Sequence, residues 1–351
     1  MVVYIPALLI TLGITYKARR EKEKNPGKSC LFIIAAGIPF ILVSGLRYYV
    51  GADYNIYKDI FNIINYGGTL NTIEKGYLWL NRIVAHFSSD YQAIMLVTAT
   101  IVTICYFVSI YLLSSDMFNS VLIWFLSLCF FESMNTVRQS LAISLFFIGI
   151  WFMFKKKWWW YFLIILVAFC FHTSAIILIF LYWIVNRKSD IKWHLWLLFG
   201  IMAVSRFVNQ FILYLPLPDR YIKYFTNLTL FTDFRFMDFV ISVLVWVLAW
   251  YFHRFVKPDQ AEKYDLFLNL QFNAVLISIL SGSVPMAYRI LQYFIYIPVF
   301  LIPEMLKASC STINKRSIKL FFALAYTMQW AYYVFAVGII DYVKYTSILS
   351  R

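Results

Sequence analysis

The sequence carries four short polar stretches between long apolar runs, and their side chains are suited to binding an anion or moving a proton. The first, RYYVGADYNIY at residues 47–57, contains Gly51, which permits a tight turn that would fold Asp53 back toward Arg47. An arginine keeps a neighbouring carboxyl group ionised and offers its guanidinium to anionic oxygens. The alternative interpretation is a salt-bridged turn with a structural role alone.

The second stretch is FESMNTVRQS at residues 131–140. Glu132 and Arg138 are six positions apart, so one continuous helix would direct them to nearly opposite faces. A helix break near Asn135 would turn both toward one pocket. The alternative is an ion pair at a helix end in the membrane interface.

The third and fourth stretches are FHTSA at residues 171–175 and SGSVPMAYR at residues 281–289. His172 is followed by a threonine and a serine, whose hydroxyls can satisfy a broken helical backbone. Arg289 follows a loop-forming glycine and proline, at the start of the next apolar run. The alternatives are a hydrogen-bonded structural histidine and an interfacial arginine that snorkels to water.

Motifs typical of several classes of enzyme are absent from the sequence. HExxH, CxxC, GxSxG, Walker A, GxGxxG and DxD patterns do not occur, and the five cysteines show no ligand spacing, so no metal and no cofactor are expected. The remaining set is rich in arginine and contains carboxylates. Guanidinium groups bind phosphate in two-point contacts, which favours an anionic, membrane-tethered ligand such as a lipid pyrophosphate.

The amino-acid composition indicates whether the chain lies in water or in lipid. Of the 351 residues, 62% are hydrophobic and 14% are charged, whereas soluble domains are about 45–50% apolar and about 25% charged. Most of the chain therefore lies in lipid, which excludes a secreted disulfide scaffold, a disordered protein and a cytosolic enzyme. The net charge of +14 is not arranged in a continuous basic stripe, so nucleic acid is not an expected partner.

The apolar runs predict an all-α polytopic membrane protein that forms a single integral domain over residues 1–351. Each crossing of the bilayer needs roughly 20 helical residues, and the sequence offers about 12 candidates, with 10–14 possible. They cover residues 2–16, 30–46, 91–113, 120–134, 138–154, 158–173, 174–186, 193–214, 237–252, 266–282, 288–306 and 320–340.

The orientation follows from Lys and Arg. More than half of these residues fall in five connections, which the positive-inside rule places in the cytoplasm. With these connections in the cytoplasm, both termini are expected to lie outside. These connections are residues 17–29, 155–157, 187–192, 253–265 and 307–319. The long aromatic segments 47–90 and 215–236 then lie outside, where they are expected to line a cavity as amphipathic loops, the second as an interfacial helix or lid.

Ionisable side chains at a membrane face are costly and therefore mark candidate functional sites. Ten of them come from distant parts of the chain and share the predicted outer face, which predicts one polar cavity. They are Arg47, Asp53, Glu74, Arg82, Glu132, Arg138, His172, Arg220, Arg235 and Arg289.

At these residues the sequence resembles the EpsG family of bacterial membrane proteins, which is grouped with the Wzy-type polysaccharide polymerases. The pieces that carry the resemblance are RYYVGADYNIY at 47–57, EKGYLWLN at 74–81, FESMNTVRQSLA at 131–142, HTSA at 172–175 and, more weakly, PMAYR at 285–289.

The resemblance implies a polymerase in the bacterial inner membrane whose active site faces the periplasm or exterior. It would move a growing glycan from undecaprenyl pyrophosphate onto a new lipid-linked repeat unit, so that the donor and acceptor oligosaccharides and the bilayer are its partners. A flippase and a chain-length regulator of the same pathway are further partners that it implies.

We assign roles on this basis as a hypothesis. Arg47, Arg138 and Arg289 would bind the pyrophosphate, and Asp53 or Glu132 would take the proton of the acceptor hydroxyl. The residues expected to be catalytic are Asp53, Glu132, Arg138 and His172. Those expected to bind or position the substrate are Arg47, Tyr54, Tyr57, Glu74, Arg220, Arg235 and Arg289.

Two other functions are compatible with the sequence. A flippase or polysaccharide transporter would also have about a dozen spans, but it would carry polar groups at mid-span, where this chain is mainly Leu, Ile, Phe and Val. A membrane acyltransferase acting on polysaccharide would need a reactive group on the cytoplasmic side for its acyl donor, and none is evident.

Overall fold

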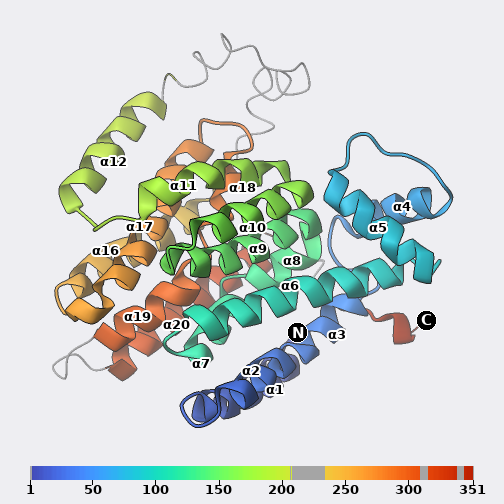
Figure 1. Cartoon of the computed structure of the whole chain (residues 1–351), viewed down its shortest axis with the longest axis horizontal. Coiled ribbons are helices and arrows are strands. Elements are labelled where there is room, and N and C mark those ends of the chain that lie inside the picture. The colour runs from blue at the N-terminus through green and yellow to red at the C-terminus, as the bar shows by residue number, and fades with distance from the viewer. Residues whose placement is uncertain (1, 206, 208–233, 309–314, 338–343, 351) are drawn as a thin grey trace. The chain divides into compact units, whose positions relative to one another are not determined.

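The computed structural model describes residues 2–205, 207, 234–308, 315–337 and 344–350 (Figure 1). Over these ranges the chain is helical and forms no strand, apart from one isolated bridge between Arg47 and Ser347. The prediction of an all-α membrane fold is confirmed.

Five helical segments of the described chain are long and apolar enough to cross a bilayer. The segment Pro26–Gly45 consists of α2 (Pro26–Ala36) and α3 (Ile38–Gly45), and the others are α6 (Gln92–Leu113), α9 (Val137–Phe154), α16 (Phe236–His253) and α17 (Pro258–Ser281). A sixth is possible where α7 (Met117–Leu126) and α8 (Cys129–Asn135) meet at a bend of 51°.

Other predicted spans fall on shorter apolar helices: α10 (Trp158–Phe171), α11 (Leu178–Val185) and α12 (Ile191–Ser205). The count of twelve crossings therefore stays a prediction.

Several helices extend beyond the predicted spans, because charge does not end a helix. The first helix, α1 (Tyr4–Glu21), runs into the basic segment predicted as a connection at 17–29. Likewise α17 begins at Pro258, inside the predicted connection 253–265, since proline is well suited to the first turn of a helix. The predicted span 288–306 is divided between α18 (Ala287–Leu291) and α19 (Pro298–Ala308).

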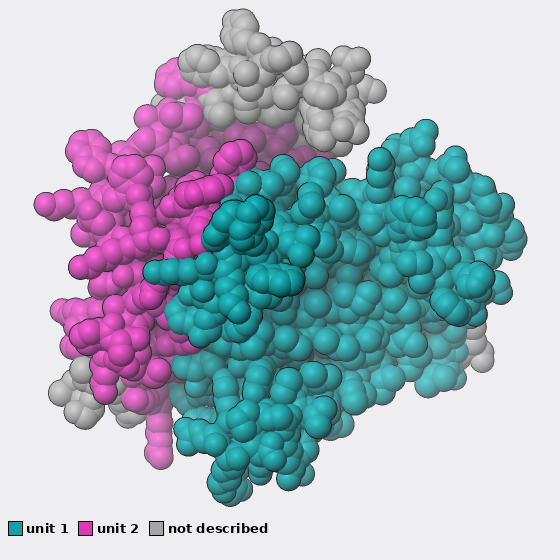
Figure 2. Space-filling model, viewed as in Figure 1, with its two compact units in different colours: residues 1–179, 319–351 teal, residues 180–318 magenta. Residues whose placement is uncertain are grey.

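Contacts divide the chain into two compact units, coloured separately in Figure 2. Unit 1 comprises residues 1–179 and 319–351, and unit 2 comprises residues 180–318. The single-domain organisation stays a prediction.

The core of unit 1 is an aromatic cluster around Trp124 of α7. Its ring lies 5.1 Å from that of Phe40 on α3 and 5.3 Å from that of Phe107 on α6, both in edge-on geometry. Phe130 of α8 adds a further ring at 5.6 Å. Large apolar rings at this density hold the bent pair α7–α8 against the neighbouring helices, so the polar residues that follow α8 have a rigid support.

The segment 47–90, predicted to be amphipathic, contains two amphipathic helices, α4 (Tyr54–Asn65) and α5 (Lys75–Phe87), which lie together in Figure 1. One face of each helix is buried, with Tyr57 and Phe61 on α4 and Tyr77 on α5. The two helices therefore have fixed rotational positions, and this decides which side chains they direct toward the rest of unit 1.

The carboxyl-terminal segment pairs with the residues around Arg47. The backbone N–H of Tyr48 donates to the carbonyl of Thr346 at 2.9 Å, and that of Ile348 donates to the carbonyl of Leu46 at 3.0 Å. The hydroxyl of Tyr345 donates to the Val43 carbonyl at 3.0 Å, beside the end of α3. The end of the chain thus holds the segment from which Arg47 extends.

We expect deletion of residues 344–351 to lower the thermal unfolding midpoint of the purified protein. Each lost hydrogen bond contributes about 1 kcal/mol, so the total loss is a few kcal/mol. Deletion of residues 349–351 is the matched control, because it leaves the paired residues in place. Equal unfolding midpoints for the two truncated proteins would show that the pairing does not stabilise the fold.

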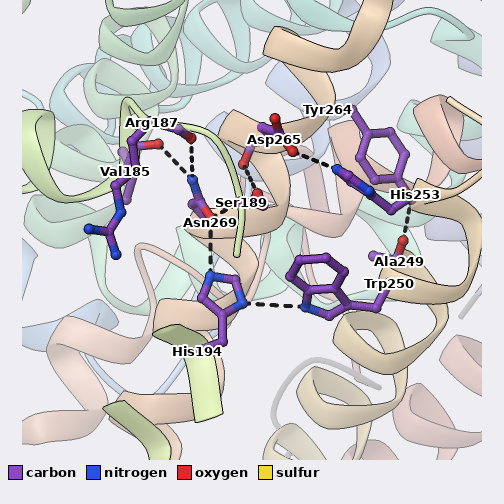
Figure 3. A network of polar contacts seen from close by, with 10 residues as sticks. All are labelled: Val185, Arg187, Ser189, His194, Ala249, Trp250, His253, Tyr264, Asp265 and Asn269. Carbon is purple, nitrogen blue, oxygen red and sulfur yellow. Dashed lines mark hydrogen bonds and ion pairs between the residues drawn. The ribbon is translucent and has the colours of Figure 1, made fainter. Parts of the chain in front are cut away.

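In unit 2 the central polar residue is Asn269 of α17 (Figure 3). Its Nδ2 donates to the carbonyls of Val185 at 3.0 Å and Arg187 at 2.8 Å, at the end of α11. Its Oδ1 accepts from Ser189 Oγ at 2.9 Å and from His194 Nε2 at 3.1 Å. One buried amide thus satisfies carbonyls that the end of a helix leaves without partners within the helix.

The imidazole of His194 is held by aromatic neighbours. Its Nδ1 accepts from the indole N–H of Trp246 at 3.2 Å and of Trp250 at 3.3 Å, and its ring stacks on Phe272 at 3.9 Å. With Nδ1 an acceptor, the proton of the neutral ring is on Nε2, which donates to Asn269. The network is therefore internally consistent, with α12, α16 and α17 joined by it.

Asn269→Asp should destabilise the protein by about 2–4 kcal/mol, because a carboxylate cannot donate to the two carbonyls and places a buried negative charge against them. Thermal unfolding in detergent measures the effect. Asn273→Asp is the matched control one helical turn later, since Asn273 makes a local bond to the Asn269 carbonyl at 2.8 Å. A smaller loss for Asn269→Asp than for Asn273→Asp would contradict the role given to Asn269.

Candidate functional site

The candidate site in unit 1 is centred on an ion pair between Arg138 and Glu74. Arg138 is the second residue of α9, and its Nη1 donates to Oε2 of Glu74, which immediately precedes α5. The side chains are 26% and 13% exposed, so the pair lies at the edge of the packed interior. Both residues sit at helix starts, where a side chain can leave the helical face.

Local backbone geometry explains these positions. Thr136 has φ −90° and ψ 57°, which interrupts the helix between α8 and α9, so the predicted break near Asn135 is confirmed. Glu74 has an extended backbone and its carboxylate makes no capping hydrogen bond to α5, which leaves it directed at Arg138. The partner of Arg138 in the described structure is thus Glu74, 64 positions away, where the sequence had pointed to Glu132.

Two buried tyrosines lie next to the pair. The side chain of Tyr57 is hydrogen-bonded to Arg138, and its ring lies 5.8 Å from that of Tyr77. Burial raises the pKa of both hydroxyls above the ordinary value for tyrosine. Both hydroxyls therefore remain neutral at physiological pH, and that of Tyr57 adds a hydrogen bond to Arg138 without adding negative charge.

Gly76 fixes the start of α5. A Cβ atom at this position would lie 2.6 Å from the carbonyl oxygen of Cys170 and 2.9 Å from its carbonyl carbon, at the end of α10. Only glycine permits this approach of two backbones. The contact between Gly76 and Cys170 fixes the position of Glu74, two residues earlier. The ion pair between Glu74 and Arg138 therefore depends on this contact.

Arg47 is buried, with 1% of its surface exposed, and it binds main-chain oxygens. Its Nη1 donates to the carbonyl of Ser44 at 2.6 Å, and its Nη2 donates to the carbonyl of Met134 at 3.0 Å. These carbonyls lie near the ends of α3 and α8, where helix ends have unsatisfied oxygens. Arg47 thus joins two helix ends just beside the break that precedes Arg138.

Asp53 reaches the same break through its backbone. Its N–H donates to Oδ1 of Asn135 at 3.0 Å, and the turn before it contains Tyr49 with φ 53° and Gly51 with φ 98°. The tight turn predicted at Gly51 is confirmed. Asn135 was not predicted as a site residue, although the polar break in which it lies was the signal that marks it.

His172 forms a local cap. It precedes the short 3-10 helix η1 (Thr173–Ile177), and its Nδ1 lies 2.6 Å from Ser174 Oγ and 3.4 Å from the Ser174 backbone N–H. The predicted interruption of the helix at this point is confirmed. These contacts match the structural alternative, and a catalytic role for His172 stays a prediction.

The other predicted site residues lie elsewhere. Arg235 precedes α16 in unit 2 and lies 3.5 Å from Asp238, and Arg289 lies on α18 of the same unit. Arg220 is outside the described residues, as is most of the predicted loop 215–236. Glu132 lies in the first turn of α8, and Tyr54 in the first turn of α4, where its hydroxyl is 3.3 Å from Gln92 Oε1.

The site of unit 1 therefore combines segments from residues 44–57, 74–77 and 134–138. Among the described residues, no three or more His, Cys, Asp or Glu side chains are placed together so that they could hold a metal ion.

A family model named EpsG matches residues 30–347, nearly the whole chain. The chain belongs to the EpsG family. EpsG is a family of Wzy-like polysaccharide polymerases, and the resemblance stated from the motifs is confirmed. Neither the curated proteins nor the solved structures include a significant match to the chain.

Membership in the EpsG family and the apolar helices together establish a multi-pass membrane protein of polysaccharide biosynthesis. The match includes every segment that builds the site of unit 1. The EpsG chain thus has, at helix starts beside its membrane-spanning segments, a guanidinium held by a carboxylate and a tyrosine, which can bind an anionic substrate group.

We expect Gly76→Ala to reduce polysaccharide formation strongly, because the added methyl group must push α5 away from the Cys170 backbone and move Glu74 from Arg138. The readout is the amount of polymer on a gel, normalised to the amount of protein in the membrane. Gly13→Ala on α1 is the control, since a methyl group added there would meet no neighbouring atom within 4 Å. Normal polymer from Gly76→Ala would show that the close approach is not needed.

Proposed function

We propose that this EpsG-family chain polymerises lipid-linked oligosaccharide repeat units. It transfers a growing glycan from undecaprenyl pyrophosphate to a hydroxyl of a new lipid-linked unit, without a metal ion, on the periplasmic or extracellular side of the bacterial inner membrane. The observation that carries the proposal is the Arg138 guanidinium, held by Glu74 and Tyr57 at the start of a membrane-spanning helix.

The leaving group of this reaction is a pyrophosphate, which needs positive charge as the glycosidic C–O bond breaks. Arg138 keeps that charge at all physiological pH values, and Glu74 fixes its direction. The Arg138 side chain is 26% exposed, so an anionic oxygen would approach the exposed part of the guanidinium while Glu74 and Tyr57 hold the rest.

The acceptor hydroxyl must lose a proton as its oxygen attacks the anomeric carbon. Asp53 or Glu132 takes this proton, and the electron pair of the broken C–O bond leaves with the pyrophosphate. Asp53 is held beside the break before Arg138 by the bond from its N–H to Asn135. This bond supports a position for one candidate base next to the segment that carries the candidate anion-binding residue.

The roles of the two unit 1 arginines differ in the proposal. Arg138 binds the pyrophosphate, whereas Arg47 positions the segment by joining two helix ends. A contribution of positive charge by Arg220, Arg235 and Arg289 stays a prediction from the sequence. Glu74 and His172 support the positions of the reacting groups.

The side of the membrane is supported by the distribution of charge. The dense Lys and Arg connections favour the cytoplasm, which leaves α4, α5 and the start of α9 on the outer side. Lipid-linked units that have been flipped outward would meet the site there.

Arg138→Ala should lower polymer formation by a factor on the order of 10²–10³, as expected when a charge-stabilising donor is removed. The test expresses the variant in a strain that lacks its own polymerase and compares surface polysaccharide ladders. Arg138→Lys keeps the charge but loses the two-point geometry, and we expect an intermediate loss.

Arg20→Ala is the matched control, because Arg20 is an exposed arginine at the end of α1. Equal amounts of each variant in the membrane must be shown by immunoblotting. Full-length ladders from Arg138→Ala would remove Arg138 from the reaction. Transport of lipid-linked units without chain growth, in vesicles that contain the purified protein, would favour a flippase.

A further inference from the structure

The outward face of α5 is unlike the rest of segment 47–90. Tyr77, Asn81 and Val84 form its buried face. On the opposite side, Trp79, Ile83 and Phe87 follow one another at intervals of four residues and are 62%, 54% and 82% exposed. Such a stripe follows one side of a helix, so three large apolar side chains form a continuous exposed surface.

Basic side chains flank this stripe. Lys75, Arg82 and His86 are exposed on the same helix, and α5 has no acidic residue from Lys75 to Phe87. The guanidinium of Arg82 lies 5.7 Å from the centre of the Trp79 ring, which keeps the charge next to the apolar stripe. We name the six residues Lys75, Trp79, Arg82, Ile83, His86 and Phe87 the α5 face.

The neighbouring helix gives an internal comparison. The exposed residues of α4 are Asn55, Ile56, Asp59 and Ile63, so its surface mixes an amide and a carboxylate with the apolar groups. The α5 face lacks both functional groups. The two helices are of similar length and lie in one connection, so the lack of amide and carboxylate groups on the exposed surface is particular to α5. A partner that is both apolar and anionic would complement such a surface.

The α5 face cannot rotate into the protein. Gly76 is packed against the Cys170 backbone, Glu74 is paired with Arg138, and the Tyr77 ring contacts that of Tyr57. These contacts hold the opposite side of the helix, so the face is presented outward by a fixed support.

We propose that the α5 face is a membrane-docking surface that lies in the headgroup region of an anionic bilayer. Trp79, Ile83 and Phe87 enter the boundary between headgroups and acyl chains, and the cationic side chains bind lipid phosphates. Aromatic and aliphatic groups flanked by Lys and Arg are typical of helices in this position. A glycan is the less suitable partner, because Ile83 and Phe87 offer no hydrogen bond to sugar hydroxyls and the face has no amide or carboxylate side chain.

The docking has a consequence for the site. Glu74 directly precedes α5, so immersion of the face holds Glu74 and Arg138 near the depth of the headgroup phosphates. The pyrophosphate of a lipid-linked sugar lies at that depth. This consequence rests on the proposed function, whereas the docking itself does not.

The test measures the depth of the α5 face in the full-length protein. Trp79→Cys, Ile83→Cys and Phe87→Cys carry a nitroxide in a background without the native cysteines, in nanodiscs that contain phosphatidylglycerol. Collisions of the nitroxide with oxygen, which partitions into lipid, are compared with collisions with a water-soluble nickel chelate. Asp59→Cys on α4 is the matched control.

We expect the ratio of oxygen to nickel accessibility to be several-fold higher at the three α5 positions than at position 59. The ratio at position 79 should fall when phosphatidylglycerol is replaced by phosphatidylcholine, and when Arg82→Gln is added. Dominant nickel collisions at the α5 positions would show a water- or glycan-facing surface and overturn the proposal, and so would protection from both reagents. An oxygen-to-nickel ratio that does not depend on lipid charge would overturn the claim that the α5 face binds anionic lipids.

A second measurement does not require cysteine-free protein. Brominated lipids quench nearby tryptophans, and the chain contains 12 of them, so the compared quantity is the fluorescence intensity per protein that bromination removes. This loss should be smaller for Trp79→Phe than for the native chain, and an equal loss would contradict immersion of Trp79. Neither result depends on polymer formation, so failure of the docking proposal is distinguishable from failure of the polymerase proposal.

Discussion

A charged side chain next to lipid must find a partner of opposite charge or water, and this constraint governs the site of unit 1. Arg138 lies in the first turn of a membrane-spanning helix, so its guanidinium would be costly to bury alone. Glu74 meets it from the start of α5, and the side chain of Tyr57 adds a hydrogen bond. The pair requires that α5 lie against α10 and that α9 begin at residue 137. The site therefore depends on the places where helices start and stop.

Those places are defined by a few residues with special backbone needs. Gly76 permits the contact of α5 with α10, Gly51 permits the turn before Asp53, and Thr136 separates α8 from α9. Each interruption frees main-chain groups that must be satisfied again. Arg47 and Asn135 bind some of these groups, so polar side chains at helix breaks can have a structural role in satisfying the backbone.

The apolar runs predicted the membrane-spanning helices α6, α9 and α16 closely, because length and hydropathy are local properties of the sequence. The breaks near Asn135 and after His172 were also predictable, since polar residues interrupt apolar runs there. The partner of Arg138 was not, because Glu74 is 64 positions away and only the packing of α5 on α10 brings it near. Asn269 was missed for a related reason: an asparagine within an apolar helix does not reveal which distant carbonyls it will bind.

Arg47 and Arg138 show why residue type alone cannot assign a role. From their types and positions in the sequence, both are expected to bind pyrophosphate. Arg47 is 1% exposed and donates to carbonyls at two helix ends, so using it for a ligand would require those carbonyls to lose their donor. Arg138 is held by side chains, and its own side chain is 26% exposed. A ligand can therefore reach Arg138 without loss of main-chain hydrogen bonds, so the proposed anion-binding role suits Arg138 better than Arg47.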